Sequence, residues 1–369
     1  MNKYGIPPHL YERPMEIELI RSMARKPLTA KQNQTLNNLL RSPDDTKDAF
    51  IVKSAADWLH DSNGRQQDGQ LFGDFWTEGE LCFLFADTNV GKSILAVQIG
   101  DALSRGVPIP GFAMPQKPET VLYFGFELSA KQFEKRYNCP QRGNYKFAPD
   151  FYRVVFNPEA TGAAKFSSYT DYLNNAIENL LTVSKAHIVI IDNITCLRSG
   201  TEAATGAISL MRHLQQLKHK YRLSVLVLAH TPKRNPAKPL SRNDLQGSKM
   251  LINFADSAFA IGESQTTPGA RYLKQIKQRS GEEVYGPKNV CLARVQKAAA
   301  FLQFSFTGHG AEANHLLHYS EQTRKQAEDH ILTLYNQGRS LRKVAEASGF
   351  SYGTVHRVVR RWEKDEKGK

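Results

Sequence analysis

The sequence has few cysteines and no long apolar run. Its four cysteines lie far apart and form no CxxC pair, which predicts reduced, structural thiols rather than a metal pair. No uninterrupted apolar stretch approaches the roughly 18 residues that a membrane helix needs. The N-terminus lacks the apolar core of a signal peptide, so we expect a cytoplasmic protein without a membrane partner.

Repeats and low-complexity tracts are also absent from the sequence, and acidic residues are outnumbered. The chain has 49 lysines and arginines against 36 aspartates and glutamates, which gives a formal net charge of +13. This balance favours a polyanionic partner such as nucleic acid, although a solvated basic surface would produce it too. At 369 residues the chain has room for one large domain and one or two small ones.

The most informative stretch runs from residue 81 to residue 103. The apolar run Leu81–Phe85 predicts a buried strand, and the apolar spacing after Ser93 predicts a buried helix. The loop between them can wrap a phosphate chain, because backbone N–H groups and a helix N-terminus face the anion. Lys92 adds a cation, and Ser93 offers a hydroxyl to Mg²⁺. The predicted nucleotide-binding residues are Asp87, Thr88, Asn89, Val90, Gly91, Lys92, Ser93 and Ile94.

This P-loop departs from the usual pattern at its first position, where Ala86 stands in place of glycine. Alanine is the smallest change from glycine, and it fits if the backbone at this position keeps φ below zero. The pattern therefore depends on Gly91-Lys92-Ser93 and on the strand and helix around it.

Three further apolar runs each end in a polar side chain, at Glu127, Asp192 and His230. Such runs predict strands that are buried on both faces, as in a parallel sheet. Because the carboxyl ends of parallel strands share one edge, we expect these side chains to converge on Lys92. There Asp192 would hold Mg²⁺, and Glu127 would orient or deprotonate the attacking water. The alternatives are a helix cap or a surface acid for Glu127, a cap of the next turn for Asp192 and a local contact for His230.

The loop Pro232–Arg242 follows His230 and is polar, basic and rich in proline. It is either a disordered surface loop or a mobile loop that faces nucleic acid or nucleotide. Strand-like segments continue at 257–262, 272–277 and 290–295, so the sheet is expected to end in antiparallel or mixed strands.

Together these segments resemble the RecA-like ATPase core of DnaB-type replicative helicases and of RepA-like hexameric helicases of plasmids and mobile elements. The resemblance covers about residues 71–303. Its most specific pieces are Phe126–Ser129, Asp244–Asp256 and Lys274–Gly281. Asp244–Asp256 resembles the segment after the family's DNA-facing loop. The resemblance implies an α/β fold with a mostly parallel central sheet, and ATP and Mg²⁺ as cofactors.

The resemblance also implies roles for matched residues. Lys92 and Ser93 would serve phosphate and Mg²⁺, and Glu127 the hydrolytic water. His230 would be the polar sensor that couples the phosphate state to the DNA loop. Lys277 and Arg279 would reach the γ-phosphate of a neighbouring subunit, which implies a homo-oligomeric ring or filament. A solvated edge strand is the alternative for these two cations.

From about residue 321 the pattern changes to short amphipathic helices. A helix from Ser340, a turn at Gly349 and a helix from Tyr352 have the geometry that places a recognition helix in the DNA major groove. The stretch 340–362 resembles the helix-turn-helix of resolvases and transposase-associated proteins. A helical protein-interaction module is the alternative. The expected DNA contacts are to bases from Tyr352, Gly353, Thr354 and His356 and to phosphates from Arg357, Arg360 and Arg361.

We therefore expect a helical accessory segment (1–70, with helical spacing at 15–23, 30–40 and 49–59), a RecA-like ATPase core (71–318) and a helix-turn-helix domain (319–369). The favoured function is a bacterial Mg²⁺-dependent ATPase that acts on DNA in a helicase-like manner. It would serve the replication, mobilisation or excision of a plasmid or mobile element, with other mobile-element proteins as further partners. The alternatives are an ATP-switched DNA-binding regulator or transposition accessory factor, and a degenerate ATPase that serves as a DNA-binding scaffold.

Overall fold

A computed structural model of the chain describes residues 54–57, 59, 69–194, 205–245, 251–317 and 321–367. The chain divides into two units, residues 1–67 and 68–369. In the first unit residues 55–57 are helical, and Ser54 Oγ accepts a hydrogen bond from the backbone N–H of Asp57 at 3.1 Å. The helices expected at 15–23 and 30–40 lie outside the described residues, as does most of the helix expected at 49–59.

A sheet of nine strands within the described residues forms the centre of the second unit, in the order β13-β12-β11-β10-β3-β9-β8-β4-β7. Six neighbouring strands of this sheet run parallel. The α/β class with a mostly parallel central sheet is therefore confirmed. The parallel strands are β10 (Ser257–Glu263), β3 (Leu81–Ala86), β9 (Ser224–His230), β8 (Ile188–Asp192), β4 (Val121–Gly125) and β7 (Phe151–Val154).

The remaining strands of the sheet are antiparallel, as the sequence predicts. They are β11 (Ala270–Lys277), β12 (Val290–Ala298) and β13 (Phe301–Gly310). We call the carboxyl ends of the parallel strands, at Ala86, Asp192 and His230, the front edge. Their amino ends, at Leu81, Ser224 and Ser257, form the rear edge.

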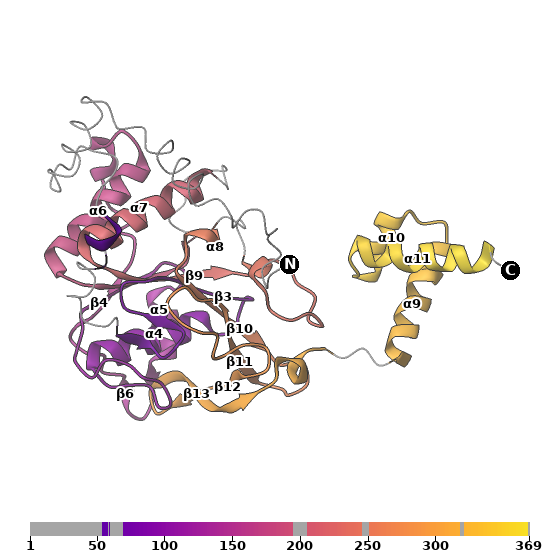
Figure 1. Cartoon of the computed structure of the whole chain (residues 1–369), viewed down its shortest axis with the longest axis horizontal. Helices are drawn as coiled ribbons and strands as arrows, with labels where there is room; N and C mark the ends of the chain where they lie inside the picture. Colours follow the sequence, from indigo (N-terminus) through magenta and orange to yellow (C-terminus); the bar gives the residue numbers. More distant parts are fainter. Residues whose placement is uncertain are drawn as a thin grey trace, which may run out of the picture. The chain divides into compact units, whose positions relative to one another are not determined.

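Helices cover both faces of the sheet (Figure 1). Alternate side chains of β3 point to opposite faces, so that Cys82 and Leu84 pack with α4 (Lys92–Arg105). Phe83 and Phe85 pack instead with α6 (Tyr169–Ser184) and α7 (Thr205–Tyr221). Burial on both faces explains why the sequences of these strands are continuous apolar runs. At Gly100 of α4 an added Cβ would lie 2.5 Å from the Phe151 ring, so the helix packs closely on the sheet.

Shorter elements complete the second unit. The helical pieces are α5 (Ala130–Arg136), α8 (Leu251–Phe254), η2 (Gly162–Lys165), η4 (Arg242–Asp244) and η5 (Glu312–His315). The strands are β1 (Gln70–Phe72), β2 (Trp76–Thr77), β5 (Asn138–Cys139) and β6 (Gly143–Asn144). None of the helices in the described ranges has the length and apolar character needed to cross a membrane.

The C-terminal helical module consists of α9 (Glu321–Asn336), α10 (Leu341–Ser348) and α11 (Tyr352–Lys367). Its small core includes Ile331, Val344 and Val355. Gly349 ends α10 with φ at 72°, a conformation that glycine adopts without strain. Ser351 Oγ then accepts a hydrogen bond from the N–H of Thr354 at 3.2 Å and caps α11. The module thus has its own core and the helix-turn-helix order predicted from the sequence.

Candidate functional site

The P-loop joins β3 to α4 at the front edge. Gly91 precedes α4 with φ at 116°, and a Cβ there would lie 2.9 Å from the Phe304 ring. Asn89 is also left-handed, with φ at 63°, which asparagine tolerates better than most residues. Ala86 is the last residue of β3, pairs with His230, and is not among the described residues with positive φ. The departure from the usual glycine is therefore accommodated because this position is extended strand.

Lys92 is almost fully buried and points back into the loop. Its Nζ donates to the carbonyl oxygens of Ala86 and Asp87, at 3.0 Å each, and lies 3.1 Å from His230 Nδ1. Burial lowers the pKa of Lys92, and the nearby charges of Asp192, Glu127 and Asp87 offset part of that effect. An ammonium group only donates hydrogen bonds, so with Lys92 protonated Nδ1 must accept and Nε2 carries the proton.

His230 Nε2 can then donate to Glu127 Oε1, which lies 3.1 Å away. The same oxygen accepts a second hydrogen bond from Asn193 Nδ2 at 2.8 Å. Burial raises the pKa of Glu127, but these two hydrogen bonds and the charge of Lys92 outweigh it, so that the pKa is lowered. Glu127 is therefore a carboxylate with one oxygen held in place. Sequence reasoning missed Asn193, whose only signal is that it follows Asp192.

Asp192 ends β8 and is only 1% exposed. Its Oδ2 accepts a hydrogen bond from the Tyr123 hydroxyl at 2.6 Å, whereas Oδ1 is buried without a partner in the described residues. Burial raises the pKa of Asp192, and the hydroxyls of Tyr123 and Ser93 offset part of the rise. An unpartnered carboxylate oxygen beside a serine hydroxyl is a hard donor pair that fits Mg²⁺.

The described residues contain no group of three or more His, Cys, Asp and Glu side chains that could hold a metal ion. A magnesium ion fits such a site when it is bound by one or two protein groups and by the phosphates of a nucleotide. Ser93 and Asp192 are the two predicted metal ligands, and they face each other across the P-loop closely enough to influence the pKa of the carboxyl.

A cavity of about 620 Å³ opens beside these side chains at the front edge. Its volume is in the range of small-molecule sites. The structure thus brings Lys92, Glu127, Asp192 and His230 together, as expected for strands that end at one edge. The cavity is lined by Asp87, Thr88, Glu127, His230, Thr231, Pro232, Lys233 and Arg234.

Lys277 and Arg279 do not join this group. Because β11 runs antiparallel, its last residue Lys277 pairs with Ala258 near the rear edge, while Ile261 pairs with Ala86 at the front. Both cations are bound to the end of α8. Lys277 Nζ donates to the carbonyls of Ile252 (2.7 Å) and Ala255 (2.6 Å), and Arg279 donates to that of Asn253 (3.0 Å). These contacts satisfy helix-terminal carbonyls and suit the helix dipole.

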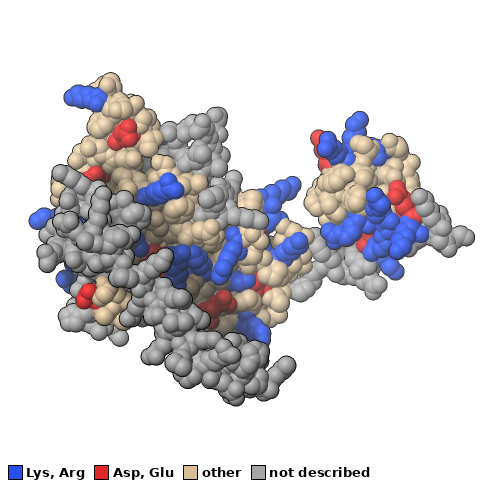
Figure 2. Space-filling model, turned by 45° about the horizontal axis from the view of Figure 1, so that its top comes forward, with Lys and Arg blue, Asp and Glu red and all other residues tan. Residues whose placement is uncertain are grey.

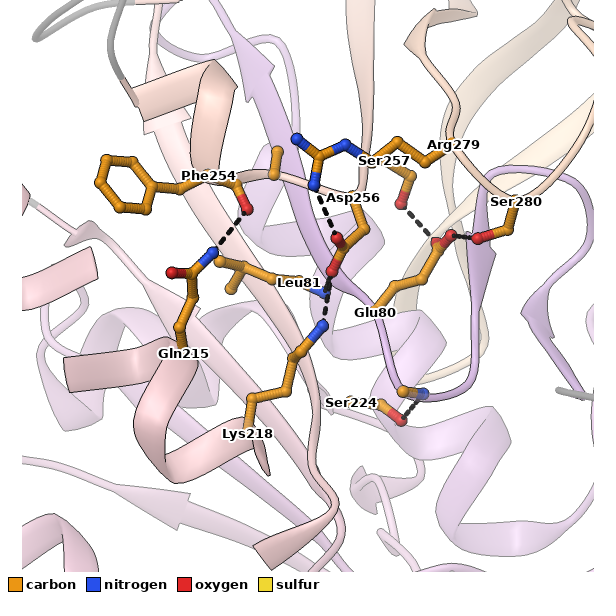
Figure 3. Close-up of polar contacts among 12 residues, drawn as sticks. Glu80, Leu81, Gln215, Lys218, Ser224, Phe254, Asp256, Ser257, Arg279 and Ser280 are labelled. Atoms are coloured by element: carbon orange, nitrogen blue, oxygen red, sulfur yellow. Dashed lines mark hydrogen bonds and ion pairs between the residues drawn. The ribbon is translucent and has the colours of Figure 1, made fainter. Parts of the chain in front are cut away.

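Arg279 also belongs to a polar network at the rear edge, shown in Figure 3. Asp256 is its centre. Asp256 Oδ2 accepts hydrogen bonds from the N–H of Leu81 (2.9 Å) and from Lys218 Nζ (2.6 Å), and Oδ1 accepts one from Arg279 (3.2 Å). Burial raises the pKa of Asp256, but these three donors outweigh it and lower the pKa. The side chain of Arg279 remains 53% exposed, so it is accessible to a partner.

The DNA-binding residues expected on α11 are mostly exposed. Tyr352 is 50% exposed, and its ring stacks on that of His356 with centroids 6.1 Å apart. Thr354 is half-buried, and its hydroxyl lies 2.9 Å from that of Ser351. Arg361 forms an ion pair with Glu328 at 2.5 Å. Helical spacing places Gly353, Arg357, Arg360 and Lys364 in one exposed stripe, of which sequence reasoning missed Lys364.

Lysine and arginine gather on the C-terminal helical module in Figure 2. Such a basic face on a helix-turn-helix fits contact with DNA phosphates.

Comparisons with known proteins agree with this geometry. A family model described as an AAA domain matches residues 51–236, and one described as a helix-turn-helix domain matches residues 320–364. A KaiC-like protein from the archaeon Pyrococcus horikoshii OT3 has a similar structure, with 14% sequence identity and a TM-score of 0.42 over 65% of this chain and 98% of that one. No curated protein is significantly similar in sequence. The two family models thereby support an AAA-type ATPase domain followed by a helix-turn-helix domain, without specificity for a DnaB-type or RepA-like helicase.

Proposed function

The chain belongs to the AAA domain family, whose model matches about half of it, and from that premise we propose that it is a Mg²⁺-dependent ATPase that acts on DNA. We further propose that it is helicase-like and serves the replication, mobilisation or excision of a plasmid or mobile element. The observation that carries the ATPase proposal is the front edge. A P-loop lysine, a carboxylate held by one oxygen and a buried carboxylate oxygen without a partner among the described residues lie there, beside a cavity that Glu127 lines.

The residues of the front edge suit hydrolysis of a nucleoside triphosphate. Lys92 and the backbone N–H groups of the P-loop bind the phosphates. Ser93 and Asp192 would hold Mg²⁺ together with the phosphates, and the bound ion would neutralise part of the phosphate charge. Asn193 and His230 hold Glu127 Oε1, which leaves Oε2 to accept a proton from the attacking water. The water oxygen bonds to the γ-phosphorus, and the bond to the ADP oxygen breaks.

His230 connects the phosphate-binding residue Lys92 with the proton acceptor Glu127. In the structure it contacts Lys92 through Nδ1 and Glu127 through Nε2. When Lys92 turns to a bound phosphate, Nδ1 loses its donor, and the imidazole is free to change its contact with Glu127. This arrangement supports the sensor role proposed for His230.

Lys277 and Arg279 support the proposal of a ring or filament. They lie at the rear edge, where they cannot serve the P-loop of their own chain. Only a second copy can bring Arg279 to a front edge, and the exposure of its side chain permits this. Lys277 Nζ donates two hydrogen bonds to carbonyls at the end of α8 and is less available to a second copy. We therefore expect Arg279 to contribute more than Lys277 to ATP hydrolysis in a neighbouring copy.

The ATPase proposal is tested by Glu127→Gln. This change removes the proton acceptor and keeps the shape of the side chain, so we expect kcat to fall by about 100-fold or more with little change in affinity for ATP. Phosphate release and calorimetric ATP binding measure the two quantities. Glu134→Gln on α5 is the control, because Glu134 is exposed and far from the P-loop in sequence. Unchanged hydrolysis in Glu127→Gln would remove this residue from the mechanism.

The DNA-binding proposal is tested by Arg357→Ala. Loss of one phosphate contact should weaken binding to duplex DNA and reduce the slope of log affinity against log salt by about 1. Fluorescence anisotropy at several salt concentrations measures both. Lys165→Ala removes an exposed cation outside the module and serves as the control. If Arg357→Ala titrates like the wild type, the module is a protein-interaction element instead.

A strand-displacement assay with ATP then distinguishes a motor from an ATP-switched DNA-binding protein. Nucleotide binding without displacement would favour the switch, and the absence of nucleotide binding would favour a scaffold.

A further inference from the structure

Thr231 is a residue of the front edge that no role described so far explains. It directly follows His230, lines the cavity and is 7% exposed. Its backbone N–H donates to the carbonyl of Ala86 at 3.1 Å, and the same carbonyl accepts a hydrogen bond from Lys92 Nζ. Thr231 is therefore next to the ammonium group that would bind the phosphates.

The hydroxyl of Thr231 is buried and has no hydrogen-bond partner among the described residues. A buried hydroxyl without a partner is less stable than one that is hydrogen-bonded, because it has lost its contact with water and gained nothing in return. The other unpartnered carboxylate or hydroxyl oxygen described at this edge is Asp192 Oδ1, which Mg²⁺ would satisfy. The guanidinium of Arg234, which also lines the cavity, contacts Asp244 and the carbonyl of Lys238 instead.

We propose that the Thr231 hydroxyl donates a hydrogen bond to a γ-phosphate oxygen of bound ATP, a contact that ADP cannot make. The proposal rests on the nucleotide-binding function proposed above. Thr231 shares a cavity wall with His230 and Glu127, where the reacting phosphate must meet its water. Both nitrogens of His230 already have partners, whereas the hydroxyl has a donor to spare. Thr231 thus recognises the third phosphate, and His230 relays its presence to Glu127.

A purely structural role makes the opposite prediction. If the threonine only fills space at the end of β9, its hydroxyl contributes nothing to nucleotide selectivity. If the hydroxyl had an important contact inside the protein, its removal would lower the stability of the free protein. Valine has the shape of threonine without the hydroxyl, and serine keeps the hydroxyl without the methyl group. The pair of variants therefore separates these possibilities.

The experiment compares the full-length wild type with Thr231→Val and Thr231→Ser. Thermal unfolding is measured without nucleotide, and affinities are measured for ADP and for a non-hydrolysable ATP analogue with Mg²⁺. Thr231→Val should unfold at the same or a higher temperature than the wild type and bind ADP equally well. Its affinity for the analogue should fall about ten-fold or more, as expected for a hydrogen bond to a charged group. Thr231→Ser should keep most of the preference for the analogue over ADP.

Three results would overturn the proposal. Thr231→Val could bind the analogue as well as the wild type does, it could lose affinity for ADP and the analogue equally, or it could unfold at a clearly lower temperature without nucleotide. A wild type that binds neither nucleotide would instead refute the nucleotide-binding function itself, and the role of Thr231 with it.

Discussion

Asp192 and Asp256 lie at opposite edges of one sheet, and their carboxylates differ in burial and in the hydrogen bonds that they accept. Asp192 at the front edge is 1% exposed, and one of its carboxylate oxygens has no partner among the residues that the structure describes. Asp256 at the rear edge is more accessible, with 20% of its side chain exposed, yet it accepts hydrogen bonds from Leu81, Lys218 and Arg279. The more deeply buried carboxylate is thus the less satisfied one. Incomplete hydrogen bonding of the carboxylate, rather than its burial, therefore distinguishes a candidate ligand-binding residue from a structural one.

The two pKa shifts express the same contrast. Burial raises the pKa of Asp192, because its few donors do not compensate for the loss of water. At Asp256 burial is outweighed by the N–H of Leu81 and the charges of Lys218 and Arg279, and the pKa is lowered. The surroundings of Asp192 therefore favour its protonated form, whereas those of Asp256 favour its ionised form.

The largest expected effect is on activity, from Asp192→Asn. The amide is a poorer ligand for Mg²⁺ than the carboxylate, so we expect ATP hydrolysis to fall by about 100-fold or more. The free energy of unfolding should change by less than about 1 kcal/mol, because a poorly compensated buried charge is removed. Phosphate release and urea unfolding measure the two effects. A large loss of stability would mean that Asp192 supports the fold, and the contrast between the edges would disappear.

The second-largest expected effect is a loss of stability in the variant Asp256→Asn. The charged partners Lys218 and Arg279 lose their acceptor, so we expect the free energy of unfolding to fall by about 2 kcal/mol. Urea unfolding beside Asp192→Asn gives the comparison directly, since the two substitutions are chemically the same. If Asp256→Asn were the milder of the two, hydrogen-bond satisfaction would be the wrong basis for separating the edges.

The dependence of these stabilities on pH should have opposite signs. The lowered pKa of Asp256 means that its contribution is present above the unfolded pKa of about 3.9 and is lost as the pH falls through the folded value. The advantage of the wild type over Asp256→Asn should therefore shrink on acidification. The raised pKa of Asp192 penalises folding above the folded value, so the wild type should gain on Asp192→Asn as the pH falls.

Much of the front edge was predictable from the sequence, because it follows from strand ends. Lys92, Glu127, Asp192 and His230 each close an apolar run or follow one, and parallel strands bring such residues together. Asn193 and Thr231 were not predictable. Their importance depends on which side-chain atoms have partners, and that is decided by packing between distant segments.

The rear edge and the loop after His230 were harder to predict for the same reason. Lys277 and Arg279 were selected from the sequence, but their position depends on the direction of β11, which apolar spacing does not fix. The loop was expected to be mobile or disordered, yet the backbone of Leu240 is bound on both sides. Its N–H donates to Glu312 Oε1 at 2.7 Å, and its carbonyl accepts from Lys274 Nζ at 2.7 Å. Glu312 lies 72 positions further along the chain, beyond any local signal.

The reversed direction of β11 has a consequence for how the protein would be regulated. An isolated molecule holds Arg279 on the side away from its own P-loop, so it lacks that cation where hydrolysis is proposed to occur. If Arg279 completes a neighbour, specific activity would rise with protein concentration and vanish on dilution. Monomers would then leave ATP intact, and only assembled copies would hydrolyse it.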